Sequence, residues 1–164
     1  MAELENIDEK QYIVAKLGSE QYGIDIAYVD NIVRMQKITR VPKTQPYFLG
    51  VINLRGEIIP VMSMRQKLEM GDDEITNTTR IIIIKPEQSA SLGLLVDEVR
   101  EVVTLSEDDV EKVSYDNGRE DANFSVTGVG KYKDTLISLV NISGIIFPSK
   151  GVTVSYAPSA SAVT

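Results

Sequence analysis

Short runs of apolar, often β-branched residues alternate with turn residues along most of this chain, and this pattern is typical of an all-β protein. Turn-forming residues separate the runs, for example at Gly18, Gly56 and the pair Asn117–Gly118. Ten strands are predicted, over Gln11–Leu17, Tyr22–Ile26, Asn31–Met35, Phe48–Asn53, Glu57–Met62, Arg80–Lys85, Leu92–Val96, Val99–Leu105, Ser125–Tyr132 and Thr135–Val140.

Helical patterns are few and short. Met64–Met70 is long enough for two helical turns, and Asn141–Phe147 is predicted to form a C-terminal helix. Ser106 followed by Asp109 is typical of the start of a short helical turn. These segments are interruptions in a strand-rich chain and do not change the predicted fold class.

One stretch fits two kinds of secondary structure. Ile26, Val29, Ile32 and Val33 have the spacing of a helical face, although the residues around them favour strands. We predict a tight helical turn around Ala27–Tyr28 with a strand on each side of it.

An internal repeat is the most informative feature of the sequence. A shift of 70 residues places Gly23–Val33 on Gly93–Val103, with glycine on glycine and apolar residues on apolar residues. A shift of 78 places Ile58–Met64 on Leu136–Ile142, and a shift of 69 places Ile13–Lys16 on Ile82–Lys85. The three matches keep their order along the chain. The alternative is that any two β-rich stretches align somewhere.

If the repeat is real, each half has about five strands in roughly 70 residues, which is the size of a small closed barrel. Units of that size are marginally stable alone, so the two halves should share a core and leave a groove between them. We predict a single domain over 1–150, with one subdomain at about 11–78 and another at about 79–147, and with some exchange of strands. The tail 151–164 is uncharged, rich in serine and alanine, and predicted to be disordered.

The charge balance narrows the range of partners. With 17 Lys and Arg against 24 Asp and Glu, the net charge is −7 and the pI about 4.7. Nucleic-acid backbones and anionic membranes repel such a surface, so we expect no nucleic-acid partner. The apolar runs are too short for membrane insertion, and the acidic N-terminus is unlike a signal peptide, so we expect a cytoplasmic protein.

The residue types present argue against most catalytic and metal sites. The chain has no Cys and no His, which excludes thiol chemistry and Cys/His zinc sites. The acidic cluster Asp72–Glu74 lacks the spacing of a calcium loop. Glu107–Asp109, which could be imagined as a catalytic acid group, is most simply charge at the start of a helical turn, and the neighbours Asp97 and Glu98 should face opposite sides of a strand. We therefore predict no catalytic residue, no metal and no cofactor. A carboxylate-dependent hydrolase or isomerase remains the alternative from another class.

Arg55 is the charged residue that the predicted topology places most distinctly. The segments Phe48–Leu54 and Glu57–Met62 should form a hairpin whose turn is Arg55–Gly56. The guanidinium is then lifted to the hairpin tip with five donors available. The alternative is a solvated arginine in a turn, without a function.

The same region carries a resemblance to a known family. Val51-Ile-Asn-Leu-Arg-Gly-Glu-Ile-Ile-Pro-Val61, preceded by Thr39–Pro42 and Phe48–Gly50, resembles the signature block of the CheW-like chemotaxis coupling proteins. Tyr22–Ile26 and Gly93–Val99 are similar to the flanking motifs of that family and occur in the same order. The resemblance extends over roughly 11–147, which is nearly all of the predicted folded chain.

The resemblance implies two five-stranded SH3-like barrels packed around a shared core. It also implies a non-enzymatic adaptor in a two-component signal transduction system. The implied partners are the regulatory domain of the histidine kinase CheA and the cytoplasmic tip of chemoreceptors. Such a protein would be cytoplasmic and recruited to membrane-associated receptor arrays.

The resemblance also implies positions for the contacts with these partners. The receptor-contacting arginine falls on Arg55, and the receptor groove falls on a segment that includes Val29, Asn31 and Ile32. The kinase contacts fall near Gly50 and the strand that begins with Arg80 and Ile81. The alternatives are that Val29 and Ile32 belong to the core and that Gly50 serves only close backbone packing.

Three positions differ from the family pattern. Asn31 is often acidic in the family, and Ser63 and Met64 occupy positions where Asp and Leu are usual. The first change bears on receptor preference. The other two bear on how the following helical turn begins, because Ser caps a helix nearly as well as Asp.

Overall fold

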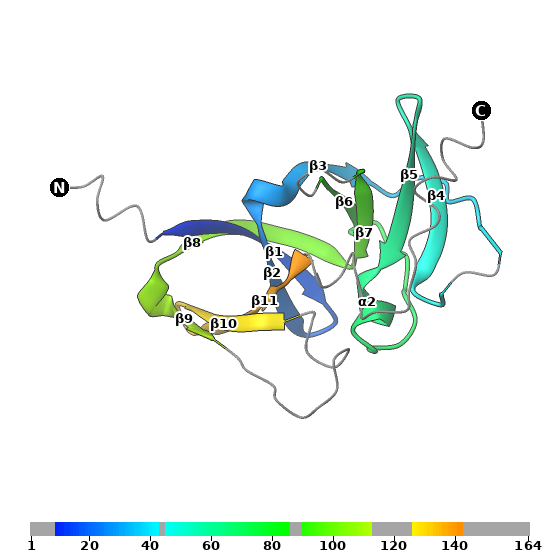
Figure 1. Cartoon of the computed structure of the whole chain (residues 1–164). Coiled ribbons are helices and arrows are strands. Elements are labelled where there is room, and N and C mark those ends of the chain that lie inside the picture. The colour runs from blue at the N-terminus through cyan, green and yellow to red at the C-terminus, as the bar shows by residue number, and fades with distance from the viewer. Residues whose placement is uncertain (1–8, 43–44, 86–89, 113–125, 143–164) are drawn as a thin grey trace.

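Strands make up most of the regular structure in a computed structural model that describes residues 9–42, 45–85, 90–112 and 126–142 (Figure 1). The all-β prediction is confirmed. The elements are β1 (Lys10–Leu17), β2 (Glu20–Asp25), η1 (Ile26–Tyr28), β3 (Val29–Arg34), β4 (Phe48–Leu54), β5 (Glu57–Ser63), α2 (Met64–Lys67), β6 (Arg80–Ile84), β7 (Leu92–Val96), β8 (Glu98–Leu105), η2 (Glu107–Asp109), β9 (Val110–Lys112), β10 (Val126–Tyr132) and β11 (Thr135–Val140).

The strands form two sheets that pack against each other. The first sheet has six strands in the order β8-β1-β2-β11-β10-β9, and the second has five in the order β3-β6-β7-β5-β4. In the first sheet β10 also contacts β8, so that this sheet curls back on itself (Figure 1). Each sheet takes strands from both halves of the chain.

The sixth strand of the first sheet was not predicted. β9 covers only Val110–Lys112, and Glu111 and Lys112 are exposed. It has no run of alternating apolar residues from which a strand could be predicted, and it pairs with β10 at Gly128–Gly130. Its stability comes from pairing with a neighbouring strand rather than from its own composition.

The pairing registers confirm the internal repeat. β2 pairs in parallel with β11, with Gly23 opposite Leu139, and β7 pairs in parallel with β5, with Gly93 opposite Val61. The shifts found in the sequence convert one pair into the other, since Gly23 corresponds to Gly93 and Val61 to Leu139. The two halves of the chain exchange strands reciprocally. β3 of the first half pairs with β6 of the second, and β8 of the second half pairs with β1 of the first.

Both repeat glycines are buried where two strands approach closely. A Cβ at Gly23 would lie 2.9 Å from Leu139 Cδ2, and a Cβ at Gly93 would lie 2.8 Å from Ile81 Cγ2. These contacts are shorter than real Cβ atoms show, so any larger residue would force the neighbouring buried side chains to shift. The matched glycines are therefore required by packing at equivalent positions of the two sheets.

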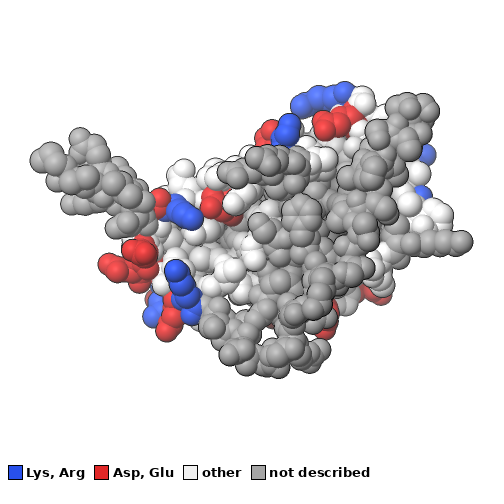
Figure 2. Space-filling model, in the orientation of Figure 1, with Lys and Arg blue, Asp and Glu red and all other residues white. Residues whose placement is uncertain are grey.

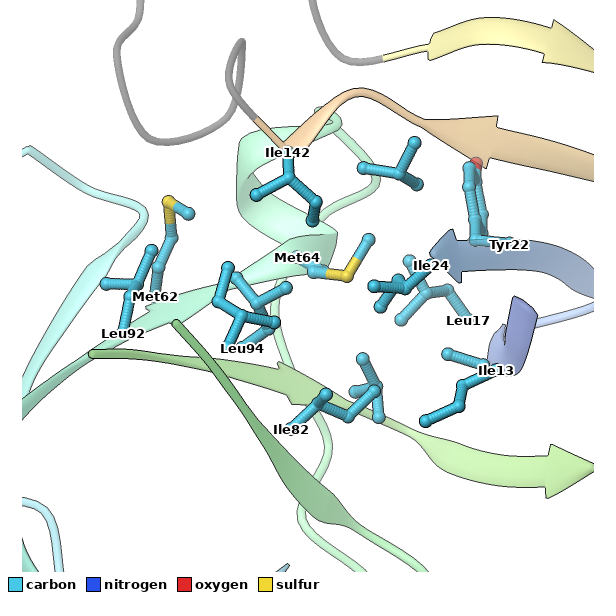
Figure 3. Close-up of a cluster of buried hydrophobic side chains, with 14 residues drawn as sticks. Ile13, Leu17, Tyr22, Ile24, Met62, Met64, Ile82, Leu92, Leu94 and Ile142 are labelled. Atoms are coloured by element: carbon cyan, nitrogen blue, oxygen red, sulfur yellow. The ribbon is translucent and has the colours of Figure 1, made fainter. Parts of the chain in front are cut away.

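Three apolar clusters fill the molecule. Two of them are each built from the strands of a single sheet. The third, here called the shared cluster, takes residues from both sheets and lies between them (Figure 3). The run Ile81–Ile84 shows the arrangement, because Ile81 and Ile83 pack in the second sheet's cluster while Ile82 and Ile84 pack in the shared cluster. The shared cluster comprises Ile13, Ala15, Leu17, Tyr22, Ile24, Met62, Met64, Ile82, Ile84, Leu92, Leu94, Val96, Val140 and Ile142.

The short helical turns form largely where they were predicted. In η1 the Asp25 carboxylate accepts a hydrogen bond from the Ala27 N–H at 2.9 Å, and in η2 Ser106 and Asp109 form a capping box. Ser63 caps α2, because its Oγ accepts from the Gln66 N–H at 3.1 Å. α2 is shorter than the predicted Met64–Met70. Beyond Ile142, the predicted C-terminal helix lies outside the described residues, as does the tail 151–164.

Asp97 ties together segments from both sheets. It lies between β7 of the second sheet and β8 of the first, and its carboxylate accepts from the Gly18 N–H in the β1–β2 turn at 2.8 Å. Arg65 of α2 donates to it from Nε at 2.8 Å and also from Nη2. The hydrogen bonds from Arg65 lower the pKa of Asp97 despite its partial burial. The carboxylate therefore stays ionised at neutral pH.

Asp73 lies beside this ion pair in a less favourable environment. Its Oδ2 is buried and has no hydrogen-bond partner within the described residues. Burial raises the pKa of Asp73, an effect that hydrogen bonds with Ser63 and Gln66 partly offset. Burial therefore disfavours the charged form of this carboxyl group in the folded protein relative to the unfolded chain.

Substituting either repeat glycine should destabilise the fold. We expect Gly23→Ala and Gly93→Ala each to lower the free energy of unfolding by roughly 1–3 kcal/mol, because the added Cβ overpacks a site with little free space. Urea denaturation measures this loss. Thr104→Ala, at an exposed position of β8, is the control and should change the free energy by no more than about 0.5 kcal/mol. Equal effects at all three positions would contradict the packing requirement.

Neutralising Asp73 should stabilise the protein at neutral pH. Because the folded pKa is raised, Asp73 favours the fold below its unfolded pKa of about 3.9 and loses that contribution as the pH rises through the folded pKa. We expect Asp73→Asn to be more stable than the wild type at pH 7 by about 1 kcal/mol. The difference should vanish at pH 3. Denaturation of both proteins at several pH values tests this, and a difference independent of pH would contradict it.

Candidate functional site

Arg55 occupies the tip of the β4–β5 hairpin, as predicted. Leu54 pairs with Glu57, so the turn consists of Arg55 and Gly56 alone, and both have positive φ, 55° and 85°. Two positive φ angles are characteristic of the tight hairpin turns that match the twist of paired strands. Asn53 supports the turn, since its Oδ1 accepts from the Gly56 N–H at 3.0 Å.

The Arg55 guanidinium is free to bind a partner. The residue is exposed, and within the described residues its side chain makes no hydrogen bond or ion pair. Ile58, which pairs with Asn53 across the hairpin, is 51% exposed. The tip therefore presents a cation with five donors beside an apolar side chain.

Val29, Asn31 and Ile32 all lie on β3. A bulge interrupts the register between Val29 and Asn31, so that one extra residue separates Val29 from Ile32. Both apolar side chains consequently pack, partly buried, against the shared cluster. The Asn31 Oδ1 accepts from the Ile32 N–H at 2.8 Å. The bulge explains why this strand has helical spacing in the sequence.

β8 repeats this arrangement on the other sheet. Its register with β1 shifts between Val14 and Ala15, so that an extra residue separates Val99 from Val102. Val99 packs partly buried against the shared cluster, and Val102 is 49% exposed opposite Ile13. The shift of 70 residues converts Val29 into Val99 and Ile32 into Val102.

We call Val29, Ile32, Val99 and Val102 the inter-sheet face. They come from the two exchanged strands, and three of them border the cluster that both sheets share. Val99 and Val102 were missed as site residues in the sequence, although the repeat had already aligned them with Val29 and Ile32. The structure brings Val29, Asn31 and Ile32 together on β3, whereas Arg55 lies on the hairpin at the opposite edge of the second sheet.

Gly50 has the close backbone packing that the sequence analysis gave as its alternative role. Its φ is +145°, and a Cβ there would lie 2.1 Å from the Thr39 carbonyl oxygen. Thr39 and Val51 form an isolated bridge, with hydrogen bonds of 2.8 and 2.9 Å, that holds the preceding loop against β4. A contact between Gly50 and the kinase stays a prediction.

The other two predicted kinase residues make internal contacts. Arg80 is half-buried, and its Nη1 donates to the carbonyl oxygens of Asn77 and Thr79 at 3.1 and 2.9 Å. Ile81 is fully buried in the cluster of the second sheet, so a partner cannot touch its side chain unless the sheet opens. Strand position alone did not reveal which face of β6 is covered.

Charged residues of both signs are mixed on the visible surface. Figure 2 shows acidic and basic side chains side by side, without an extended basic area among the described residues of that face. Within the described ranges, no group of three or more acidic residues could hold a metal ion. None of the helices described here is long and apolar enough to cross a membrane.

Comparison with known proteins gives a consistent family assignment. A family model described as the CheW-like domain matches residues 11–147. The chain is 34% identical to the chemotaxis protein CheW of Bacillus subtilis (strain 168) over 137 residues, which cover 84% of this chain and 86% of that protein. It is 30% identical to the chemotaxis protein CheW of Helicobacter pylori over 142 residues, covering 87% of this chain and 84% of that one.

A solved structure agrees with the sequence comparisons. The crystal structure of the scaffolding protein TtCheW from Thermoanaerobacter tengcongensis matches with a TM-score of 0.77 and 31% identity, over 87% of this chain and 95% of that chain. This match supports two SH3-like barrels as the fold. The exchanged strands, the arginine-tipped hairpin and these similarities lead to one conclusion: this chain belongs to the CheW-like family.

Proposed function

We propose that this protein is a non-enzymatic adaptor that couples chemoreceptors to the histidine kinase CheA. The observation that carries the proposal is that the fold offers both a partly exposed apolar face between two sheets and a hairpin tip whose guanidinium has no partner among the described residues. Members of the family to which the chain belongs are named chemotaxis proteins, and the similar solved structure is titled a scaffolding protein. An adaptor of this kind needs surfaces for two proteins rather than a reactive group.

The inter-sheet face is the surface that we assign to the receptor. Val102 is half exposed and the other three side chains are partly buried, so a receptor helix can remove further apolar area from water. Arg55 would contribute hydrogen bonds to polar groups of the receptor tip. Asn31 is partly exposed next to Ile32 and is placed to affect which receptor is preferred.

The kinase would bind the second sheet, near the β4–β5 hairpin. Gly50 fixes the path of β4, and Ile58 supplies an exposed apolar side chain on the paired strand. Arg80 retains exposed surface at the start of β6, whereas the buried Ile81 would support this region from below. We further propose that the protein is cytoplasmic and joins membrane-associated arrays through these two contacts.

Reversing the charge at the hairpin tip should weaken receptor binding selectively. We expect Arg55→Glu to lower affinity for a receptor tip fragment at least about tenfold, because it removes the donors and introduces repulsion. Binding to the regulatory domain of the kinase should be retained. Isothermal titration against each partner measures both.

Lys133→Glu is the matched control for that experiment. Lys133 occupies the equivalent turn of the β10–β11 hairpin, also with positive φ, and undergoes the same change of charge. Its receptor affinity should match the wild type. Full receptor binding by Arg55→Glu would show that the assignment of Arg55 is wrong.

A charge on the β8 side of the inter-sheet face should also prevent receptor binding. We expect Val102→Asp to lower receptor affinity at least about tenfold, since the complex would bury an unpaired carboxylate. Thr104→Asp, exposed on the same strand, should bind as the wild type does. The half exposure of Val102 lets the variant fold, which circular dichroism checks. If both variants bind normally, β8 is not part of the receptor surface.

A further inference from the structure

The second crossing of the chain between the two sheets is held by an ion pair. Within the described residues the chain passes from the first sheet to the second through η1 and returns through the single residue Asp97. At η1 the Asp25 carboxylate caps its own turn, through the Ala27 N–H. Asp97 instead accepts from Gly18, in the β1–β2 turn of the first sheet, and from Arg65 of α2, which directly follows β5 of the second sheet, so its contacts bridge the sheets.

The Arg65–Asp97 ion pair, here called the bridge, is short and partly buried, and hydrogen bonds from other segments support it. The Arg65 and Asp97 side chains are only 18% and 24% exposed, and two nitrogens of the guanidinium donate to the two carboxylate oxygens. A Cβ at Gly18 would lie 3.6 Å from Arg65 Nη2, which places the β1–β2 turn against the guanidinium. The Thr78 hydroxyl donates to the Asp97 carbonyl oxygen at 3.0 Å. Such a two-pronged pair restricts orientation as well as distance.

The position of the bridge bears on the surfaces described above. In Figure 1, α2, which carries Arg65, lies below β7, whereas β3, which carries Val29 and Ile32, lies above it. The apolar contacts of the shared cluster are not directional, so they restrict the angle between the sheets less sharply than a two-pronged ion pair does. A directional contact at α2, on one side of that cluster, therefore limits how far the two sheets can tilt relative to each other at β3, on its other side.

We propose that the Arg65–Asp97 ion pair is a positioning pair that fixes the orientation of the two sheets relative to each other. In doing so it fixes the position of β8, which follows Asp97 in the first sheet, relative to β3 of the second. It thereby sets the width of the inter-sheet face and its distance from the β4–β5 hairpin. Its importance for signalling rests on the proposed function, but its effect on sheet orientation does not.

The orientation can be measured directly, because the chain has no cysteine and accepts spin labels at chosen positions. Glu57→Cys in the second sheet and Lys131→Cys in the first are both exposed. Double electron–electron resonance between them should give a narrow distance distribution in the otherwise wild-type protein. Asp97→Asn and Arg65→Met should broaden or shift this distribution while the far-ultraviolet circular dichroism stays that of a folded β protein.

Removing a different ion pair provides the matched control. Lys10 and Asp25 lie 3.9 Å apart on β1 and β2 of the same sheet, so Lys10→Met removes an ion pair without touching the bridge. Its distribution should match that of the labelled parent. If Arg65→Met does not fold, Asp97→Asn and Thr78→Val still test the bridge, since each removes a smaller part of it. Unchanged distributions in the folded bridge variants would overturn the proposal.

A second measurement separates this proposal from the proposed function. Unlabelled Asp97→Asn should bind the kinase regulatory domain with unchanged affinity. It should bind the receptor fragment more weakly, because the inter-sheet face is no longer held at one width, and it should lose receptor-dependent stimulation of the full-length kinase. If the wild type binds neither partner, the proposed function fails, while the distance measurement still decides the role of the ion pair. Normal stimulation by a variant whose distribution has broadened would overturn the claim that orientation matters for coupling.

Discussion

The shared apolar cluster is the constraint on which the rest of the structure depends. β1, β2, β6 and β7 each contribute residues to it, and the run Ile81–Ile84 is buried on both faces. A strand buried on both faces cannot exist without a covering layer on each side. Neither sheet is therefore a stable unit without the other, and the reciprocal exchange of β3 and β8 ties the two sheets together through the backbone as well.

Burial explains why the candidate surfaces lie where they do. The exchanged strands run along the border of the shared cluster, so their bulged apolar residues are neither fully covered nor fully exposed. Side chains of that kind bind a partner without first having to leave a core. The hairpin tip differs, since Arg55 stands in a two-residue turn and its guanidinium pairs with none of the described residues.

Much of this arrangement could be predicted from the sequence because it depends on periodic signals. Alternating apolar residues predicted ten of the strands, and the matched glycines at 23 and 93 marked the repeat that the pairing registers confirm. The position of Arg55 followed from a two-residue turn between two apolar strands. Each of these features is local or recurs at a fixed interval.

The features that were missed depend on contacts between distant segments. β9 has no pattern of its own, the burial of Ile81 depends on what covers β6, and Arg80 is occupied by carbonyl groups that only the folded chain brings close. The helical spacing of Val29 and Ile32 was ambiguous because a bulge and a helix both place an extra residue between two side chains on one face. Only pairing with a neighbouring strand distinguishes the two.

The matched bulges and turns of the two halves bear on how a partner could distinguish one half of the molecule from the other. A partner that recognised only the backbone would meet nearly the same outline on either half of the molecule. The side chains at equivalent positions nevertheless differ: arginine stands against lysine at the hairpin turns, Asp30 against Arg100 in the two bulges, and Asn31 against Glu101 beside them. The two halves of the backbone are thus distinguished by the side chains that they carry, which point mutations can alter without touching the scaffold.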